Sequence, residues 1–405
     1  MGDRVLIQFN NNAEEVIHLY NTHKPIVDVL TEKDNPICNI IGTDDKVEDS
    51  DKDTIIKVKT KKPLGQGGSG VVYSIEIGNK FGNKSNDYVV KLAYEIDANN
   101  MIKPCYSDIQ RSYKPTAKLP SHYKFPFSKE IREPNYTCNE TYSEYLISLL
   151  MSRLYKNGNV SGKPTGPFCI NFIDVLDFVT CYKPLTQYTF MERMDGVLYD
   201  AINESKLDEI DIKSIIIQIL FAICMYQHHY KISHNDLHAE NIFVKNIDNG
   251  DIIYNGKSLK DVKYFAYKLP NDKYIFFPRG KYLIKIGDWG YSCKFSDTKI
   301  LNEDVMTGKT SIKRPNWYEP LYDLLYVIDI LIETEDTFAY VIRNIITSGN
   351  RIPYHKENRR PILSSLVKAP VSKFKTAERV IKMMGNDLSF NRCNNKEGVA
   401  LIGSL

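Results

Sequence analysis

A cluster of glycines near residue 65 is the feature that most limits how this 405-residue chain can fold. The run Gly65-Gln66-Gly67-Gly68-Ser69-Gly70-Val71-Val72 fits the pattern G-x-G-x-x-G-x-V. A dinucleotide-binding fold would place such glycines between a strand and a helix. Here residues 55–59 and 71–77 both alternate as strands do, so the glycines are predicted to form a hairpin loop. Such a loop can lie over phosphates, because glycine lets the backbone approach an anion and expose its N–H groups.

A third short strand is predicted over residues 88–92, and it carries Lys91. Three strands joined by glycine-rich turns predict a small antiparallel sheet. Lys91 could be an ordinary solvent-facing lysine. The next strand of the same sheet can, however, bring it beneath the glycine loop, where its charge would lie on the α- and β-phosphates of a nucleotide. The spacing between the glycines and Lys91 favours this functional interpretation.

The chain becomes helical beyond Glu192. A buried helix is predicted around residues 215–223, and it leads into the polar run His234-Asn235-Asp236-Leu237-His238-Ala239-Glu240-Asn241. A short apolar strand over residues 283–286 then leads into Asp288-Trp289-Gly290. Because a strand-rich half precedes a helix-rich half, the sequence predicts an α+β protein with two lobes.

Three side chains of this second half carry oxygens suited to chemistry on a phosphate. Mg²⁺ takes oxygen ligands, usually one or two carboxylates together with substrate phosphates, and Asn241 and Asp288 supply side-chain oxygens of that type. Asp236 can orient an acceptor hydroxyl and take its proton. Each residue alone is better explained as a loop or helix-capping side chain. Three of them behind a glycine loop and a strand lysine favour a shared function.

These four motifs together resemble those of the eukaryotic-type protein kinase superfamily, and they occur in the family's order. They are the glycine run 65–72, Val89-Val90-Lys91, the run 234–241 and Asp288-Trp289-Gly290. Three further features resemble divergent serine/threonine kinases of large DNA viruses. They are the sequence of residues 234–238, the long insert before Asp288 and the run Asn316-Trp317-Tyr318-Glu319-Pro320.

The resemblance implies a two-lobed fold, with a small antiparallel sheet in the N-lobe and a mainly helical C-lobe. It implies transfer of the γ-phosphoryl group of ATP, with Mg²⁺, to Ser or Thr hydroxyls of an unidentified protein substrate. Asp236 would be the catalytic base, Lys91 would hold the α- and β-phosphates, and Asn241 and Asp288 would bind the metal. The nucleotide would contact Leu64, Gly65, Gln66, Gly67, Gly68, Ser69, Gly70, Val71, Val72, Lys91, Met191, Glu192 and Met194.

The family also pairs its strand lysine with a helix glutamate, for which Glu144 is the preferred candidate and Glu140 the rival. The helix is indicated by Leu146, Leu149, Leu150 and Leu154, with Gly158 as its stop. An alternative is that Thr141-Tyr142-Ser143-Glu144 forms a capping box, in which Glu144 satisfies backbone donors. Phosphoryl transfer of this type requires the ion pair, which favours Glu144 as the partner of Lys91.

Several positions depart from the family pattern. Asn235 replaces the usual arginine, which indicates that no phosphorylated activation segment is met there. His238 replaces the common lysine, and because histidine also occurs here in small-molecule phosphotransferases, it leaves the substrate class open. Trp289 keeps a large apolar anchor, and Asp323 is expected to brace the catalytic loop. A small-molecule kinase and a pseudokinase scaffold are the two alternatives.

The predicted organisation has four parts. They are an N-terminal extension over 1–54, an N-lobe over 55–192 with an insertion at about 93–138, a C-lobe over 193–345 with an insertion at about 245–282, and a C-terminal part over 346–405 of unknown role. The net charge of +3 argues against a dedicated nucleic-acid binder. Eight scattered cysteines without a C-x-x-C pair, no apolar signal core and no membrane-spanning run predict an intracellular, cytoplasmic protein, in a host cell or virion if viral.

Overall fold

The protein is α+β, with mostly antiparallel sheets and several helices, as the sequence predicts. The structure, a computed structural model, describes residues 30–31, 46–49, 54–59, 62–66, 70–79, 86–93, 140–158, 166–182, 185–204, 207–230, 232–250, 252–254, 257–294, 321–325, 327, 337–347, 376–387 and 398–405. These residues belong to two compact units. The first takes them from Met1–Ser107, Glu133–Leu150 and Asp174–Arg193, the second from Met151–Ile173 and Met194–Leu405.

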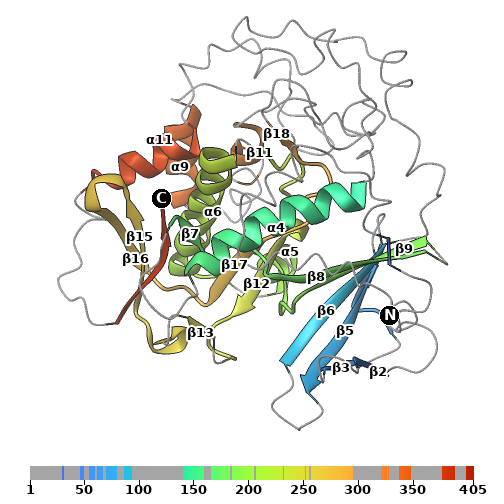
Figure 1. The fold of residues 1–405 in the computed structure, drawn as a ribbon. Coiled ribbons are helices and arrows are strands. Elements are labelled where there is room, and N and C mark those ends of the chain that lie inside the picture. The colour runs from blue at the N-terminus through green and yellow to red at the C-terminus, as the bar shows by residue number, and fades with distance from the viewer. Residues whose placement is uncertain are drawn as a thin grey trace, which may run out of the picture. The chain divides into compact units, whose positions relative to one another are not determined.

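The first unit is built on one sheet with the strand order β1-β8-β9-β6-β5-β3-β2, in which β4 also pairs with β5. The three strands expected from the sequence are its centre and pair antiparallel (Figure 1): β3 (Thr54–Val58), β5 (Gly70–Asn79) and β6 (Asn86–Ala93). β8 (Val175–Tyr182) and β9 (Leu185–Glu192) extend it. Ile75 and Val90 are fully buried, so this sheet has its own apolar core.

The described parts of the predicted N-terminal extension are strands of this same sheet. β2 (Lys46–Asp49) pairs antiparallel with β3, and β1 (Leu30–Thr31) pairs parallel with β8. They occupy its two edges, where an unpaired strand would otherwise present open N–H and C=O groups. The extension therefore completes the sheet, and β1 makes it mixed and no longer purely antiparallel.

Helix α4 (Glu140–Gly158) carries the chain from the first unit into the second. Ile147, Leu150 and Leu154 are buried at the spacing of one helix face. The helix ends at Gly158, as predicted, where a Cβ would collide with the Tyr254 hydroxyl and the Phe168 ring. Since residues 151–173 belong to the second unit, the predicted N-lobe over 55–192 differs from the first unit there.

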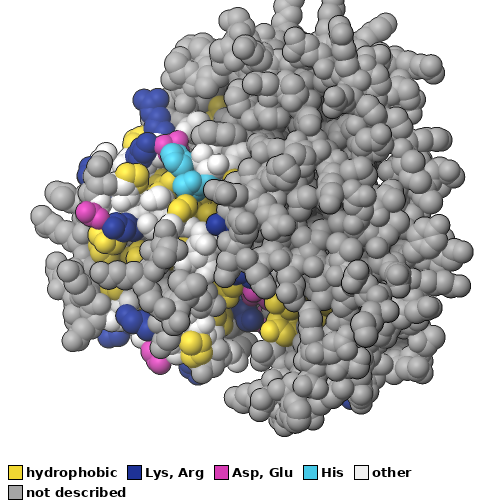
Figure 2. Space-filling model, viewed as in Figure 1, with side chains coloured by type: hydrophobic (Ala, Val, Ile, Leu, Met, Phe, Trp, Pro, Cys, Tyr) yellow, Lys and Arg dark blue, Asp and Glu magenta, His cyan; other side chains and the backbone are white. Residues whose placement is uncertain are grey.

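Helix α6 (Glu209–Tyr230) is the centre of the second unit, and it is buried along nearly its whole length. Strand β17 (Tyr282–Ile286) lies beside it and pairs antiparallel with β12 (Ile242–Asn246). Strand β10 (Gly196–Val197) and helix α5 (Leu198–Glu204) lie next to β12. Helices α9 (Thr337–Thr347) and α11 (Ala377–Met384) pack on α6. At the end of α6, His228 Nδ1 lies 3.6 Å from Glu378 Oε1 of α11. Figure 2 shows one face of the molecule, on which histidine lies beside acidic and basic side chains.

A second sheet joins segments far apart in the chain, in the order β16-β15-β19-β7. The predicted insertion supplies β15 (Tyr264–Leu269) and β16 (Lys273–Pro278), whereas β7 (Phe168–Cys169) follows α4. β19 (Val399–Ser404) pairs parallel with β15 and antiparallel with β7. The Tyr267 ring stacks on Phe221 of α6 with centroids 3.7 Å apart. The C-terminal part, for which no role was predicted, thus supplies a central strand.

No helix in the described ranges is long and apolar enough to cross a membrane.

Candidate active site

The glycine run forms a hairpin, as its flanking strands predict. β4 (Gly65–Gln66) pairs with β5, placing Gly65 opposite Val72 and Gln66 opposite Val71. A Cβ at Gly70 would collide with the Leu92 carbonyl, so close packing of β5 on β6 requires glycine there. Gly67, Gly68 and Ser69 lie outside the described residues. Packing thus explains Gly70, whereas among the described residues no neighbouring atom stands within 4 Å of a Cβ at Gly65.

Lys91 and Glu144 form a two-pronged ion pair within the first unit. Lys91 lies on β6 opposite Val72 of β5, and its Nζ is 2.8 Å from both Glu144 Oε1 and Oε2. The two side chains are only 13% and 12% exposed, so screening by water is reduced. Because both carboxylate oxygens accept from Lys91, the geometry favours the predicted ion pair over the capping-box interpretation. The role of the pair in catalysis stays a prediction.

The residues expected around an adenine ring are placed less uniformly. Met191 and Glu192 end β9, opposite Val89 and Tyr88 of β6. The Glu192 N–H donates to the Asp174 carbonyl at 2.9 Å, and its carboxylate accepts from the Asp174 N–H at 2.7 Å. The Glu192 N–H is therefore already used within the first unit. Leu64 is 51% exposed and Val72 half-buried, while Met194 belongs to the second unit.

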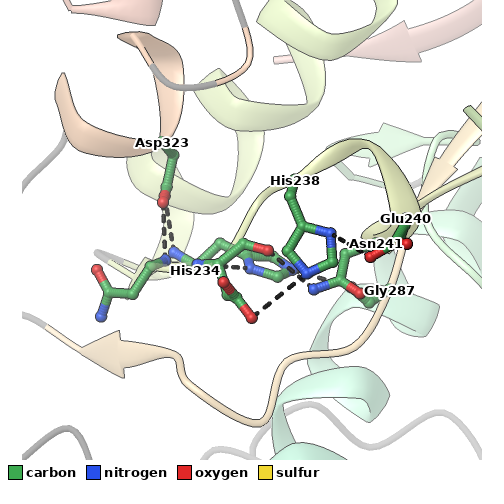
Figure 3. Close-up of polar contacts among 8 residues, drawn as sticks. His234, His238, Glu240, Asn241, Gly287 and Asp323 are labelled. Carbon is green, nitrogen blue, oxygen red and sulfur yellow. Dashed lines mark hydrogen bonds and ion pairs between the residues drawn. The ribbon is translucent and has the colours of Figure 1, made fainter. Parts of the chain in front are cut away.

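The predicted catalytic loop follows α6 and the short strand β11 (Ile232–Ser233) in the second unit. Asp323, fully buried, accepts from the backbone N–H groups of His234 and Asn235, both at 2.7 Å (Figure 3). It also accepts from the Tyr226 hydroxyl at 2.9 Å. Burial raises the pKa of Asp323, while the nearby His234 and these hydrogen bonds act in the opposite direction. The expected brace of the loop by Asp323 is confirmed.

Gly287 connects the Asp236 segment to the Asp288 segment. His234 Nε2 donates to the Gly287 carbonyl at 2.9 Å, and the Gly287 N–H donates to the Asn241 carbonyl at 3.2 Å. His234 Nδ1 accepts from the Asp236 N–H at 3.3 Å, so the ring carries its hydrogen on Nε2. A Cβ at Gly287 would overlap Ile173, which explains the glycine. The loop of the predicted base and the loop of a predicted metal ligand are thus held together.

Trp289 keeps the apolar anchor role that the sequence predicts. It is 1% exposed, and its ring meets Tyr226 edge-on with centroids 5.2 Å apart. It also lies 4.6 Å from the His234 ring and 6.2 Å from that of Phe172. The Trp289 ring therefore packs against the rings of Tyr226, His234 and Phe172, and it anchors the backbone immediately after Asp288.

Two site residues have left-handed backbones. Asn235 has φ of 65° and Asp288 has φ of 59°, a region that asparagine and aspartate tolerate best among residues with side chains. Asn235 is fully buried, whereas Asp288 is half-buried. Such strained residues gather at active sites, where surrounding contacts hold them.

His238 lies between two acidic side chains. Its Nε2 is 3.5 Å from Asp236 Oδ2, and its Nδ1 is 3.5 Å from Glu240 Oε2 (Figure 3). A protonated imidazole can donate to both carboxylates, but a neutral one to only one. His238, one of the residues that depart from the kinase pattern, is therefore next to the predicted base.

The donor set at Asn241 and Asp288 fits a hard cation. The Asn241 amide nitrogen donates to the Asp236 carbonyl at 2.8 Å, which turns its side-chain oxygen to the other side of the group. Within the described part of the chain, no group of three or more His, Cys, Asp or Glu side chains could hold a metal ion. A magnesium site with two protein oxygens does not need one, because phosphates and water complete its octahedron.

Sequence reasoning missed three groups that shape this site. Tyr226 reads only as part of a buried helix, Gly287 acts through its backbone, and Glu240 has no local signal. Neither a scan against protein-family models nor a search of curated proteins finds a match to the chain. The function is therefore inferred from the residues and their geometry.

Proposed function

We propose that the chain is a protein kinase that transfers the γ-phosphoryl group of MgATP to Ser or Thr hydroxyls of a protein substrate. The observation that carries this proposal is the pair of hydrogen bonds that Gly287 makes, one with His234 and one with Asn241. Through it, the loop bearing Asp236 and Asn241 and the residue before Asp288 are held as one constellation. A set of unrelated loop residues would have no reason to be connected in this way.

The two units are proposed to be the two lobes of a kinase-like fold. In the first, Lys91 would contact the α- and β-phosphates, and Glu144 would hold its ammonium group in place. Phosphoryl transfer depends mainly on positioning and charge stabilisation, because the protein itself makes no covalent bond to the phosphoryl group. A lysine fixed by two short hydrogen bonds suits that task better than a freely rotating one.

In the second unit, Asn241 and Asp288 would hold Mg²⁺. When bound, Mg²⁺ would neutralise charge on the phosphate oxygens. Asp236 would accept a hydrogen bond from the acceptor hydroxyl and take its proton as the hydroxyl attacks. Asp236 is only 5% exposed, and His238 Nε2 lies 3.5 Å from its Oδ2, so the acceptor would meet a carboxylate with a histidine beside it.

The test is incubation of the purified chain with radiolabelled ATP and generic acceptor proteins, followed by phosphoamino-acid analysis. Labelled phosphoserine or phosphothreonine is expected with the wild-type chain and not with Asp236→Asn, which keeps the side-chain shape. Melting curves of both proteins serve as the folding control. Equal labelling by the two proteins would remove Asp236 from the mechanism.

A small-molecule phosphotransferase is the second candidate, and His238 beside Asp236 is the observation that favours it. A panel of sugars and aminoglycosides in the same assay separates the two functions. Transfer to a small molecule with no protein labelling would select this alternative. If there is no transfer but ATP binds, the chain would be a pseudokinase scaffold.

A further inference from the structure

Asn235 makes a contact that neither the brace by Asp323 nor the Gly287 link explains. Its side-chain Nδ2 donates to the backbone carbonyl of Tyr291 at 3.1 Å. Tyr291 follows Asp288-Trp289-Gly290, and Asn235 immediately precedes Asp236. The contact therefore joins the chain on the far side of the predicted metal ligand to the chain next to the predicted base.

An asparagine side chain is energetically unfavourable at this position in two respects, its backbone conformation and its buried oxygen. Its φ of 65° costs least with glycine, yet the residue is asparagine. The residue is fully buried, and its Oδ1 accepts no hydrogen bond from any residue that the structure describes. A buried acceptor without a donor is unfavourable. What the side chain provides in return is its bond to Tyr291.

The surrounding bonds leave Asn235 little freedom. Its backbone N–H is held by Asp323 Oδ1 at 2.7 Å, so the residue is fixed relative to the loop. Beyond Tyr291, β11 pairs with β18 (Cys293–Lys294), placing Ser233 opposite Cys293. The Ser292 N–H donates to the Trp289 carbonyl at 3.1 Å and forms a turn between them. The Asn235–Tyr291 hydrogen bond therefore fixes the segment that connects Asp288 to the paired strands β11 and β18.

We infer that Asn235 is a positioning residue that fixes the Asp288–Tyr291 turn against the Asp236 loop, and so sets the separation of the predicted metal ligand and the predicted base. This inference rests on the proposed kinase function. The bond is between an uncharged carboxamide and a backbone carbonyl, so the alignment needs no charged or modified partner. It is present in the unmodified chain.

Asn235→Gly is the sharpest test, because glycine accepts the left-handed backbone and removes both the bond to Tyr291 and the unpaired Oδ1. We expect its melting temperature to stay within about 2 °C of wild type and its kcat to fall about tenfold or more. The matched control is Asn203→Ala. The Asn203 amide also donates to a backbone carbonyl, that of Tyr199 at 2.9 Å, but at the exposed end of α5. The control should keep full kcat.

Hydrogen exchange provides a readout that does not depend on activity. In Asn235→Gly, amides of residues 289–294 should exchange at least about threefold faster, while those of α6 stay unchanged. Wild-type exchange in this segment together with wild-type kcat would overturn the inference and leave the kinase proposal intact. A loss of melting temperature with uniformly faster exchange would also overturn it, by making Asn235 merely structural. If the wild-type chain shows no phosphoryl transfer, the proposed function fails, while the exchange result still tests the link.

Discussion

Lys91 donates to both carboxylate oxygens of Glu144, which lies 53 positions later in the chain, at 2.8 Å each. Helix α4 and strand β6 are joined by this pair within the first unit. A symmetric, mostly buried pair of this kind fixes the lysine ammonium in direction as well as position. The pair can be tested apart from any assumption about substrate.

We expect Lys91→Met and Glu144→Gln each to lower activity about 100-fold, because both leave the phosphate-binding charge absent or unfixed. Each single change should also cost about 1–3 kcal/mol of unfolding free energy, since it leaves one partner poorly compensated. The double variant Lys91→Met/Glu144→Gln should lose less stability than the sum of the two single losses, without regaining activity. Urea denaturation and the labelling assay measure the two effects, and additive stability losses would contradict the pair.

Asp288→Asn is expected to abolish the effect of Mg²⁺ on nucleotide binding. Asparagine keeps the shape and tolerates the φ of 59°, so the fold should survive while the carboxylate charge is lost. Wild-type melting temperature should rise with a non-hydrolysable ATP analogue more strongly when Mg²⁺ is present, by the usual linkage of binding to stability. The variant should show the same rise with or without Mg²⁺.

Asp272→Asn is the matched control for that experiment. Asp272 also has a left-handed backbone, with φ of 55°, but it is exposed and pairs with Lys268 at 2.7 Å. It lies in the short turn that connects β15 and β16. Its replacement should leave the magnesium dependence at the wild-type value. A similar loss in both variants would assign the effect to altered backbone strain.

Asp323→Asn is expected to destabilise the second unit, although it changes only one atom type. The wild-type carboxylate accepts three hydrogen bonds, from His234, Asn235 and Tyr226. An amide nitrogen in place of either carboxylate oxygen would face donors and could accept from none of them. Facing donors without an acceptor cost about 2–4 kcal/mol in a buried site. Thermal unfolding followed by circular dichroism measures this loss. A change below about 0.5 kcal/mol, typical of neutral surface sites, would mean that the brace has little effect on stability.

The central sheet and the Lys91–Glu144 pair could be predicted because their signals are local. Alternating strands flank the glycine run, and apolar residues on one face of α4 mark the helix that carries Glu144. The edge strands could not, because β1 has two residues and pairs parallel with β8, which leaves no periodicity to read. The pairing of β19 could not be predicted either, because its partner β15 lies far earlier in the chain. The link through Gly287 is made by backbone atoms, which residue type does not reveal.

Cys169 of β7 provides a probe of its pairing with β19. Burial raises the pKa of its thiol to about 12, and a bond to Asn171 and the nearby Lys285 only partly oppose this. The thiolate is the reactive form, so at pH 8.5 the native thiol should stay protonated and resist iodoacetamide. Peptide mapping by mass spectrometry should find Cys169 unlabelled in the native protein and labelled in urea. Labelling at the rate of an exposed cysteine would contradict its burial.

Removal of β19 should expose Cys169 selectively. Gly403 of β19 pairs with Cys169 of β7, and Ile402, fully buried, accepts a hydrogen bond from the Ile170 N–H at 3.1 Å. A chain ending at Glu397 loses these contacts, so Cys169 should become reactive under native conditions. Cys224, buried on α6, is the internal control and should stay protected if the change is local. Reaction of both cysteines would mean that β19 supports the whole second unit, whereas protection of both would mean that β7 stays covered without it.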